Sequence, residues 1–305
     1  YHAAMMAKYA IERWTRLPVE IDIASEFRYR DPVLDEQTLV VGISQSGETL
    51  DTLAAVKYAK AQGATLLAVT NVVDSAMARE ADAVLYTRAG PEIGVAATKT
   101  FTTQLVAMQL LALWLAHARG SLDDAVIQNA VAAMFALPEQ VEEVLGQSES
   151  IREMATKWAD RRDFFFLGRS AAFPVAMEGA LKLKEIAYVR AEGYPAGEMK
   201  HGPIALIEDG VVVVGVATNS HVKSKMLSNV EEMRARKGTI LLVLTEGDEE
   251  GAAVADETIF VPWAPELLSP VTSVVPLQLL AYWLAKQRDL DVDNPRTRAK
   301  PVTVE

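Results

Sequence analysis

The sequence contains no cysteine among its 305 residues. This absence excludes disulfide bonds, zinc sites built on thiolates and a cysteine nucleophile within the chain. Positive charge is also scarce, because 30 lysines and arginines face 41 aspartates and glutamates, a formal net charge of −11. Surfaces that bind nucleic acid are basic, so this balance argues against a nucleic-acid partner. Backbone N–H groups and hydroxyls could still hold a phosphate without bulk positive charge.

Long hydrophobic runs are absent as well. The most apolar stretch, residues 105–115, is too short to cross a bilayer and contains Gln109. The chain opens on Tyr1 without a basic and then apolar leader, so we expect no signal peptide, no membrane partner and a cytoplasmic location. It opens inside a helical pattern, whereas a parallel α/β unit supplies a strand first. We therefore expect a fragment that lacks its first strand.

The most informative stretch is residues 40–49, which reads Val-Val-Gly-Ile-Ser-Gln-Ser-Gly-Glu-Thr. An apolar strand runs into a turn rich in hydroxyls, and a helical pattern begins near Glu48. The free N–H groups and positive dipole end of that helix, beside Ser44, Ser46 and Thr49, suit a phosphate monoester. An ordinary helix cap is the alternative. Because the turn holds more hydroxyls than capping needs, we favour a phosphate site.

The chain repeats its own architecture. Residues 38–70 and 211–245 both run strand, polar turn, helix, glycine and strand. Residues 109–116, Gln-Leu-Leu-Ala-Leu-Trp-Leu-Ala, return as residues 278–285, Gln-Leu-Leu-Ala-Tyr-Trp-Leu-Ala. Helices that alternate with buried strands predict a parallel sheet in each copy.

We therefore predict an α/β fold of two tandem, doubly wound, flavodoxin-like domains with parallel sheets. The first domain covers residues 1–135, the second covers 136–290, and an extended tail covers 291–305. The turn at 44–49 corresponds to 217–222 in the second copy, where the hydroxyl cluster is diluted. This difference predicts one phosphate site per chain, at the carboxyl ends of the first set of strands.

A charged face is predicted on the helix that follows the apolar strand at 164–168. Glu178, Lys182 and Glu185 are four and three residues apart, which places them on one side of that helix. A solvated stripe of salt bridges is the alternative. The neighbouring positions are apolar, so we expect partial burial, which would raise the pKa of a carboxyl and lower the pKa of a lysine.

Two further segments carry candidate groups. The loop over residues 193–203 is shaped by glycines and prolines and presents His201, whereas the other three histidines have no special neighbours in the sequence. The tail carries Arg296 and Lys300. These basic groups could be solvated, or could fold over a site to supply an amine or exclude water.

Taken together, these motifs resemble the isomerase half of glucosamine-6-phosphate synthases, which consists of two sugar isomerase (SIS) domains in tandem. The resemblance covers essentially the whole chain and rests on residues 44–49, 92–104, 178–185, 200–203 and 299–305. It implies conversion of fructose 6-phosphate and glutamine into glucosamine 6-phosphate and glutamate by a homodimer. The ammonia would come from a separate N-terminal glutaminase domain with a cysteine nucleophile, which this chain does not contain.

The resemblance also implies two groups of substrate-binding residues. The phosphate would be held by Ser44, Gln45, Ser46 and Thr49. The sugar would be lined by Val95, Ala97 and Ala299. Family members often have serine at position 97, so one hydroxyl contact is missing from that pattern here.

The resemblance further implies a set of catalytic roles. Glu185 would be the base that moves a proton between C1 and C2, and His201 would help to open the sugar ring from the neighbouring subunit. Lys300 would form an imine with the open-chain ketose. Glu178 and Lys182 would supply supporting charges around the base. No metal and no organic cofactor is required.

Two alternatives stay open beside the synthase. One is a stand-alone SIS isomerase or deaminase that acts on another amino-sugar phosphate. The other is a non-catalytic module that senses a sugar phosphate. A sensor needs only the phosphate site, so the joint presence of Glu185, His201 and Lys300 argues against it.

Overall fold

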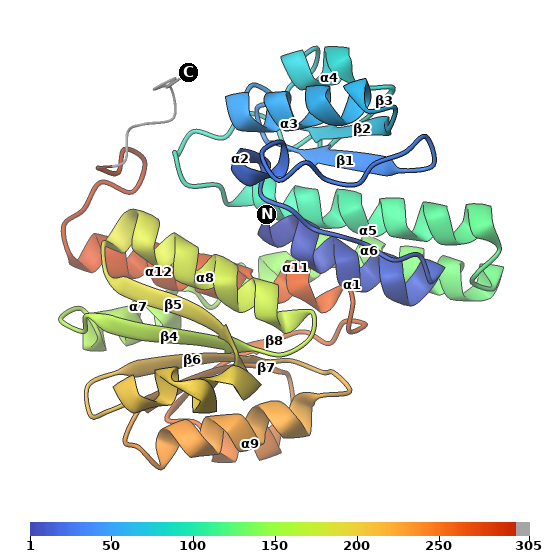
Figure 1. The fold of residues 1–305 in the computed structure, drawn as a ribbon. Coiled ribbons are helices and arrows are strands. Elements are labelled where there is room, and N and C mark those ends of the chain that lie inside the picture. The colour runs from blue at the N-terminus through green and yellow to red at the C-terminus, as the bar shows by residue number, and fades with distance from the viewer. Residues whose placement is uncertain (297–305) are drawn as a thin grey trace.

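The structure is a computed structural model that describes residues 1–296. It contains two separate parallel sheets, each with helices on both faces, so the predicted α/β architecture is confirmed (Figure 1). Of the predicted tail, residues 291–296 form neither helix nor strand, and residues 297–305 lie outside the described part of the chain.

The first sheet has three strands in the order β1 (Leu39–Ile43), β2 (Thr65–Thr70) and β3 (Ala83–Tyr86). One face is covered by α3 (Leu50–Ala61) and α4 (Ala76–Glu80), and the other by α1 (His2–Thr15) and α5 (Lys99–Arg119). The short helix α2 (Ala24–Phe27) packs beside α3. Because helices cover both faces, the centre of the sheet is apolar.

The second sheet has five parallel strands. Their order is β5 (Arg190–Pro195), β4 (Asp163–Gly168), β6 (Val212–Ala217), β7 (Thr239–Thr245) and β8 (Glu257–Val261). The helices of this half are α6 (Asp124–Leu145), α7 (Ser148–Lys157), α8 (Ala172–Ala187), α9 (Lys223–Arg234), α10 (Glu249–Ala253), α11 (Ser269–Ser273) and α12 (Val275–Gln287). Two 3₁₀ turns, η1 (Ala196–His201) and η2 (Pro203–Leu206), follow β5.

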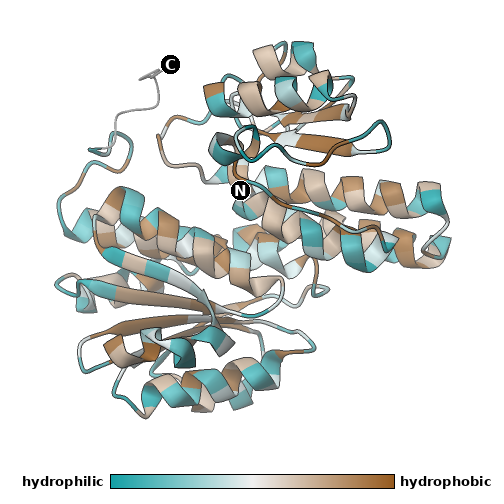
Figure 2. Ribbon diagram, in the orientation of Figure 1, coloured by the Kyte–Doolittle hydropathy of each residue, from teal (hydrophilic) through white to brown (hydrophobic). Residues whose placement is uncertain are grey.

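Alternate side chains of β4 serve two different cores. Phe164 and Phe166 point toward α7, α8 and α12, whereas Phe165 and Leu167 point toward α9 and η1. This is the two-residue period of a strand with both faces buried. Figure 2 shows the result, with hydrophobic residues gathered on the strands and polar residues on the outer side of α9.

A glycine at the same place in the strand of each copy allows close packing of its neighbours. Gly42 in β1 and Gly215 in β6 occupy the same place in their strand motifs. An added Cβ would lie 2.8 Å from Val56 of α3 at Gly42, and 2.5 Å from Leu242 of β7 at Gly215. A larger residue would force neighbouring elements apart at either position.

The two halves are joined by a common core rather than by a bare linker. Helix α6 runs unbroken through residue 135, so the predicted boundary between 1–135 and 136–290 falls inside a helix. Ala3 and Met6 of α1 and Leu105 of α5 belong to the same buried cluster as α8 and α12 of the second half. The boundary stays a prediction, but the packing crosses it.

Helix α5 is longer than the apolar stretch recognised in the sequence. Within the described chain it is the one helix long and apolar enough to span a membrane, by length and composition alone. Half of that apolar window is buried inside the fold, against α1 and the first sheet.

Candidate functional site

The predicted phosphate cradle is the turn between β1 and α3. Ser44 is buried, and its hydroxyl accepts a hydrogen bond from the N–H of Gly47 at 3.1 Å and lies 3.3 Å from the hydroxyl of Thr49. The hydroxyl of Ser46 accepts from the N–H of Glu48 at 3.2 Å. Gln45 is half-buried, and its carbonyl accepts from the N–H of Asn71 at 3.0 Å. The four predicted residues therefore form one compact turn.

The N-terminus of α3 is open to a ligand. Thr49 occupies the N-cap position, but its side chain makes no capping hydrogen bond. The first N–H groups of a helix have no partner within the helix itself, so they remain available here. This observation weakens the alternative that the hydroxyl cluster is an ordinary cap. An anion placed at this end would meet free donors and the positive end of the helix dipole.

Gly47 fixes the shape of the turn. Its φ of 67° lies in the left-handed region, and an added Cβ would lie 2.1 Å from the hydroxyl oxygen of Ser75. The carbonyl of Gly47 accepts from Met77 at 3.0 Å, and the carboxylate of Glu48 accepts from the N–H of Ala76 at 2.8 Å. The turn is thus held against the start of α4, and Glu48 has a structural partner.

The corresponding turn of the second copy uses its polar groups internally. Thr218 is buried, with its hydroxyl 3.4 Å from that of Ser269, and the N–H of Asn219 donates to Thr245 at 2.8 Å. His221 pairs with Glu266 at 2.7 Å. The polar groups of this turn are thus used within the fold, and the number of phosphate sites per chain stays a prediction.

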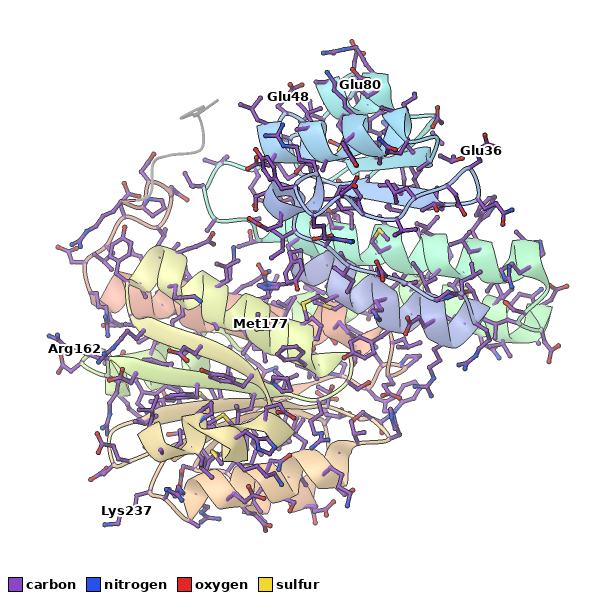
Figure 3. The ribbon with its side chains drawn as sticks, in the orientation of Figure 1. Glu36, Glu48, Glu80, Arg162, Met177 and Lys237 are labelled. Carbon is purple, nitrogen blue, oxygen red and sulfur yellow. The ribbon has the colours of Figure 1, made fainter. Side chains whose placement is uncertain are left out.

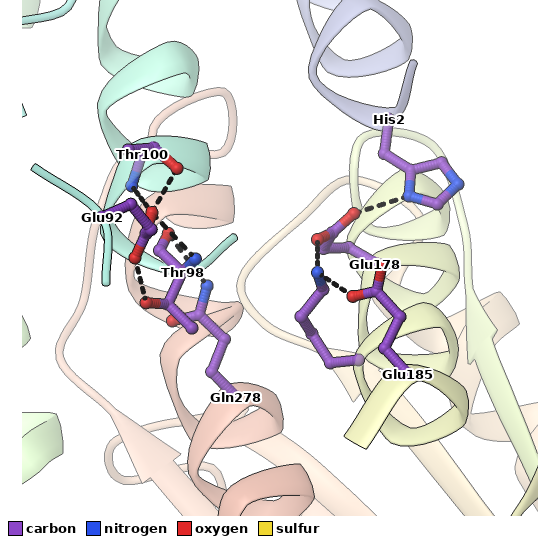
Figure 4. Close-up of polar contacts among 8 residues, drawn as sticks. His2, Glu92, Thr98, Thr100, Glu178, Glu185 and Gln278 are labelled. Carbon is purple, nitrogen blue, oxygen red and sulfur yellow. Dashed lines mark hydrogen bonds and ion pairs between the residues drawn. The ribbon is translucent and has the colours of Figure 1, made fainter. Parts of the chain in front are cut away.

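A second polar network holds the loop that carries Val95 and Ala97 (Figure 4). The Glu92 carboxylate accepts from the N–H of Thr100 at 3.0 Å, from the hydroxyl of Thr98 at 3.0 Å, and from the hydroxyl of Thr100. Burial alone would raise the pKa of Glu92, but these hydrogen bonds outweigh it and lower the pKa. The carboxylate therefore stays ionised and fixes the start of α5.

The predicted charged face of α8 is buried rather than solvated. Figure 4 shows Glu178 and Glu185 close together on this helix. Glu178 and Lys182 are 4% and 3% exposed, while the side chain of Glu185 is 33% exposed. The Lys182 ammonium lies 3.4 Å from the carboxylate of Glu178 and 2.5 Å from that of Glu185. Lys182 thus bridges the two carboxylates, and Glu185 is the more exposed of the two acids.

The expected direction of the carboxyl pKa is wrong for Glu178. Burial on its own raises this pKa, as the sequence led us to expect. The hydrogen bond from His2 and the charge of Lys182 act in the opposite direction and together prevail, so the pKa of Glu178 is lowered. Glu178 is therefore a fixed negative charge rather than a proton reservoir.

His2 is a site residue that sequence reasoning missed, because it looked to have no special neighbours. Its Nδ1 atom lies 2.7 Å from Oε2 of Glu178, across 176 residues of sequence. The contact exists only because the start of α1 meets α8, and no local sequence pattern predicts it. Tyr1, His2 and Glu178 also line a cavity of about 490 Å³, together with Phe101 and Gln104 of α5.

His201 lies apart from this cluster in the chain as described. It ends η1 and is exposed, and η1 packs through Ala196 and Met199 into the core on the α9 side of the second sheet. Glu178, Lys182 and Glu185 lie on α8, which covers the opposite face. The structure therefore joins the acid–base helix with His2 and leaves His201 on the other layer.

The segment before the tail motif is attached next to the acid–base helix. The N–H of Arg296 donates to the hydroxyl of Tyr188 at 2.6 Å, and its guanidinium lies 4.7 Å from the centre of that ring. Tyr188 caps the C-terminus of α8, three residues after Glu185. The carbonyl of Asp293 accepts from the N–H of Val95 at 3.3 Å. Ala299 and Lys300 lie outside the described residues.

Comparison with known proteins gives this geometry a family. The model of the SIS domain matches residues 1–114 and 158–287, which are the two halves of the repeat. The chain belongs to the SIS domain family. Residues 115–157, which include all of α6 and α7, lie between the two matched segments.

Similar proteins of known name belong to one group within this family. The chain is 51% identical over 305 residues to the glutamine–fructose-6-phosphate aminotransferase (isomerizing) of Clostridium acetobutylicum, and 53% identical over 304 residues to that of Thermus thermophilus. Each match covers all of this chain and 50% of the relative, so the chain spans about half the length of these proteins.

A solved structure agrees. The C-terminal domain of glucosamine-fructose-6-phosphate aminotransferase from Francisella tularensis is 40% identical with a TM-score of 0.93, and the match covers 96% of this chain and 83% of that one. A glucosamine-6-phosphate deaminase from Thermotoga maritima is 25% identical with a TM-score of 0.75, covering 97% and 85%. The predicted resemblance to the isomerase half of glucosamine-6-phosphate synthases is confirmed.

Proposed function

We propose that this SIS protein converts fructose 6-phosphate and ammonia into glucosamine 6-phosphate, as the isomerase part of a glucosamine-6-phosphate synthase. The observation that carries the proposal is the state of Glu185. Its carboxylate is partly exposed at the end of a buried charge cluster and is held by Lys182 at 2.5 Å. A base in that position can take a proton from a sugar carbon, and its contact with Lys182 keeps the carboxylate in one orientation.

The roles of the other residues follow from the chemistry. The phosphate would be anchored at the turn over residues 44–49, where binding energy from a remote group orients the reacting end of the sugar. Lys300 would condense with the C2 carbonyl of the open-chain ketose, which releases water and activates the neighbouring carbon. Ammonia would replace that lysine at C2. Glu185 would then move a proton from C1 to C2, while the C1 hydroxyl loses its proton and the imine nitrogen gains one, which turns the ketose imine into the amino aldose.

The remaining charges would keep that base in place. Lys182 neutralises Glu178 and orients Glu185, and His2 holds the second oxygen of Glu178. Ammonia would come from glutamine in a separate N-terminal glutaminase domain, in agreement with the half-length match to the relatives. We expect the cytoplasm as the compartment, because the relatives are named for a reaction on a phosphorylated metabolite.

We also propose that the chain works as a homodimer in which the partner subunit donates His201. Two features support this arrangement. His201 is exposed and lies on the layer opposite α8, so a second chain offers a direct route for it to approach a substrate at Glu185. In addition, Leu110, Trp114 and Phe135 of the α5–α6 hairpin are 44%, 63% and 82% exposed, which is typical of a surface that another chain covers.

One experiment separates the synthase from its alternatives. The chain is incubated with fructose 6-phosphate and an ammonium salt, and both glucosamine 6-phosphate and glucose 6-phosphate are assayed. The proposal predicts that the amino sugar forms and that it accumulates in proportion to ammonia. Glucose 6-phosphate alone would indicate an isomerase of another kind. Binding of the sugar phosphate without any product would indicate a sensor.

The similarity to a glucosamine-6-phosphate deaminase favours one second candidate, the reverse reaction. A deaminase would release ammonia from glucosamine 6-phosphate with the same base and the same phosphate anchor. Initial rates in the two directions distinguish the candidates. A deaminase would turn over glucosamine 6-phosphate faster than it forms it at every accessible ammonia concentration.

A further inference from the structure

A second cavity lies at the amino ends of β4 and β5. Its volume is about 550 Å³, and none of the described residues assigned to the sugar-phosphate site lines it. Its charged lining residues come from three separate segments of the chain. They are Asp160, Arg162, Arg190, Arg288 and Arg296. We call this cavity the arginine pocket.

The arginine pocket is positively charged, whereas the chain as a whole is negatively charged. Four arginines and one aspartate give the lining a formal charge of +3, in a protein whose formal net charge is −11. Arg190 is partly offset by Asp163, with Nε 2.9 Å from Oδ1. Even with Asp163 counted, the lining keeps an excess of two positive charges. Clustering of like charges is unfavourable unless an anion approaches them.

The other positive charges of the pocket affect Arg288. Its two terminal nitrogens donate to the carbonyls of Ala187 and Arg161, at 3.2 and 2.5 Å. Its Nε is buried and has no hydrogen-bond partner among the described residues. Burial, and then the charge of Arg162, lower the pKa of Arg288. The protein therefore holds this cation in place at a cost that a nearby anion would reduce.

Arg162 and Arg296 provide the accessible part of the pocket. Arg162 is exposed, and Figure 3 shows its side chain at the outer edge of the fold. Within residues 1–296 its guanidinium makes no hydrogen bond and no ion pair. Arg296 is oriented by stacking on Tyr188, at 4.7 Å from the ring centre. The guanidinium of Arg162 is free to move, and that of Arg296 has a fixed orientation. Both line the arginine pocket, so both can bind the same anion.

We propose that the arginine pocket binds a small phosphate-bearing metabolite at a site separate from the sugar-phosphate turn. The planar fork of a guanidinium matches two oxygens of a phosphate, and several forks around one cavity give strong, oriented binding. The volume lies in the range of small-molecule sites. The pocket takes the phosphate group itself, and the remainder of the ligand occupies the space beside it.

The test uses inorganic pyrophosphate as the probe and isothermal titration calorimetry on the 305-residue chain. The sugar-phosphate turn is first weakened by Thr49→Ala, so that a larger share of the remaining heat comes from the arginine pocket. Arg162→Gln is then added, because Arg162 is exposed and its loss should not disturb folding. Arg236→Gln, at another exposed arginine just beyond α9, is the matched control.

We expect saturable binding in the Thr49→Ala chain and in the Arg236→Gln control. Arg162→Gln should weaken the Kd by at least about tenfold, the loss expected when one hydrogen bond to a charged group is removed. Arg190→Gln should also weaken it. The proposal is overturned if the Thr49→Ala chain shows no saturable binding, or if both pocket variants bind as tightly as the control. This result does not depend on which reaction the chain catalyses.

Discussion

The imidazole of His2 and the carboxylate of Glu178 are joined by a contact of 2.7 Å, which ties the first turn of the chain to the middle of α8. Both side chains are largely buried, at 12% and 5% exposed. Because Lys182 contacts the other oxygen of Glu178, this histidine is one of two groups that compensate a buried negative charge. The start of α1 is therefore part of the acid–base cluster, not merely next to it.

His2→Ala should destabilise the protein. Removal of one partner from a buried carboxylate costs about 1–3 kcal/mol of unfolding free energy. Urea unfolding of the variant and the wild type measures the change. His117→Ala is the matched control, because His117 contacts Asp124 at 3.5 Å on the surface, where such pairs contribute little. Equal effects of the two substitutions would show that the buried contact contributes no more to the free energy of unfolding than the exposed one.

The lowered pKa of Glu178 predicts how stability depends on pH. A carboxyl whose pKa is lower in the folded state stabilises the fold above its ordinary value of 4.5, and this contribution is lost as the pH falls through the folded pKa. Unfolding free energies between pH 7 and pH 3 should therefore decline more steeply in the wild type than in Glu178→Gln. Parallel curves would mean that Glu178 has the same pKa folded and unfolded.

Gly47→Ala should disrupt the turn by two effects. The left-handed backbone costs about 1–2 kcal/mol for a residue with a Cβ, and the clash with Ser75 adds about 1–3 kcal/mol. Gly120→Ala separates them, because Gly120 has a φ of 62° with nothing within 4 Å of the added Cβ. Thermal or urea unfolding should rank Gly47→Ala well below Gly120→Ala. If the two are equally stable, the close packing of the turn is not real.

Thr49→Ala should weaken the binding of a sugar phosphate but not of the sugar alone. The hydroxyl of Thr49 lies at the open N-terminus of α3, and the loss of one hydrogen bond to an anion corresponds to roughly a tenfold rise in Kd. Calorimetric titrations with fructose 6-phosphate and with fructose give the comparison. A chain that binds fructose as tightly as its phosphate would rule out the turn as a phosphate anchor.

The fold was accessible to sequence reasoning because its signals are local. The strand–turn–helix at residues 38–61, its second copy and the spacing of Glu178, Lys182 and Glu185 can each be recognised within a short window. The parallel sheets follow because helices alternate with continuous apolar strands. Even the burial of the charged face was foreseen, from the apolar residues beside it.

What could not be foreseen depends on contacts between distant segments. His2 meets Glu178 only when α1 crosses α8, and that contact reverses the expected direction of the Glu178 pKa. The arginine pocket gathers residues from three segments, within 159–162, 187–190 and 288–296, and no segment is unusual by itself. The common core that crosses residue 135 is likewise a property of packing rather than of pattern.

We propose Glu185 as the base of a sugar-phosphate isomerase site. The most direct measurement compares the wild type with Glu185→Gln for isomerisation of fructose 6-phosphate and, in parallel, for binding of that sugar phosphate by calorimetry. We expect the rate to fall by about 10²–10⁴-fold, the usual contribution of a positioned base, while the Kd changes only a few-fold. Isomerisation at the wild-type rate, or an equal loss of binding and rate, would contradict it.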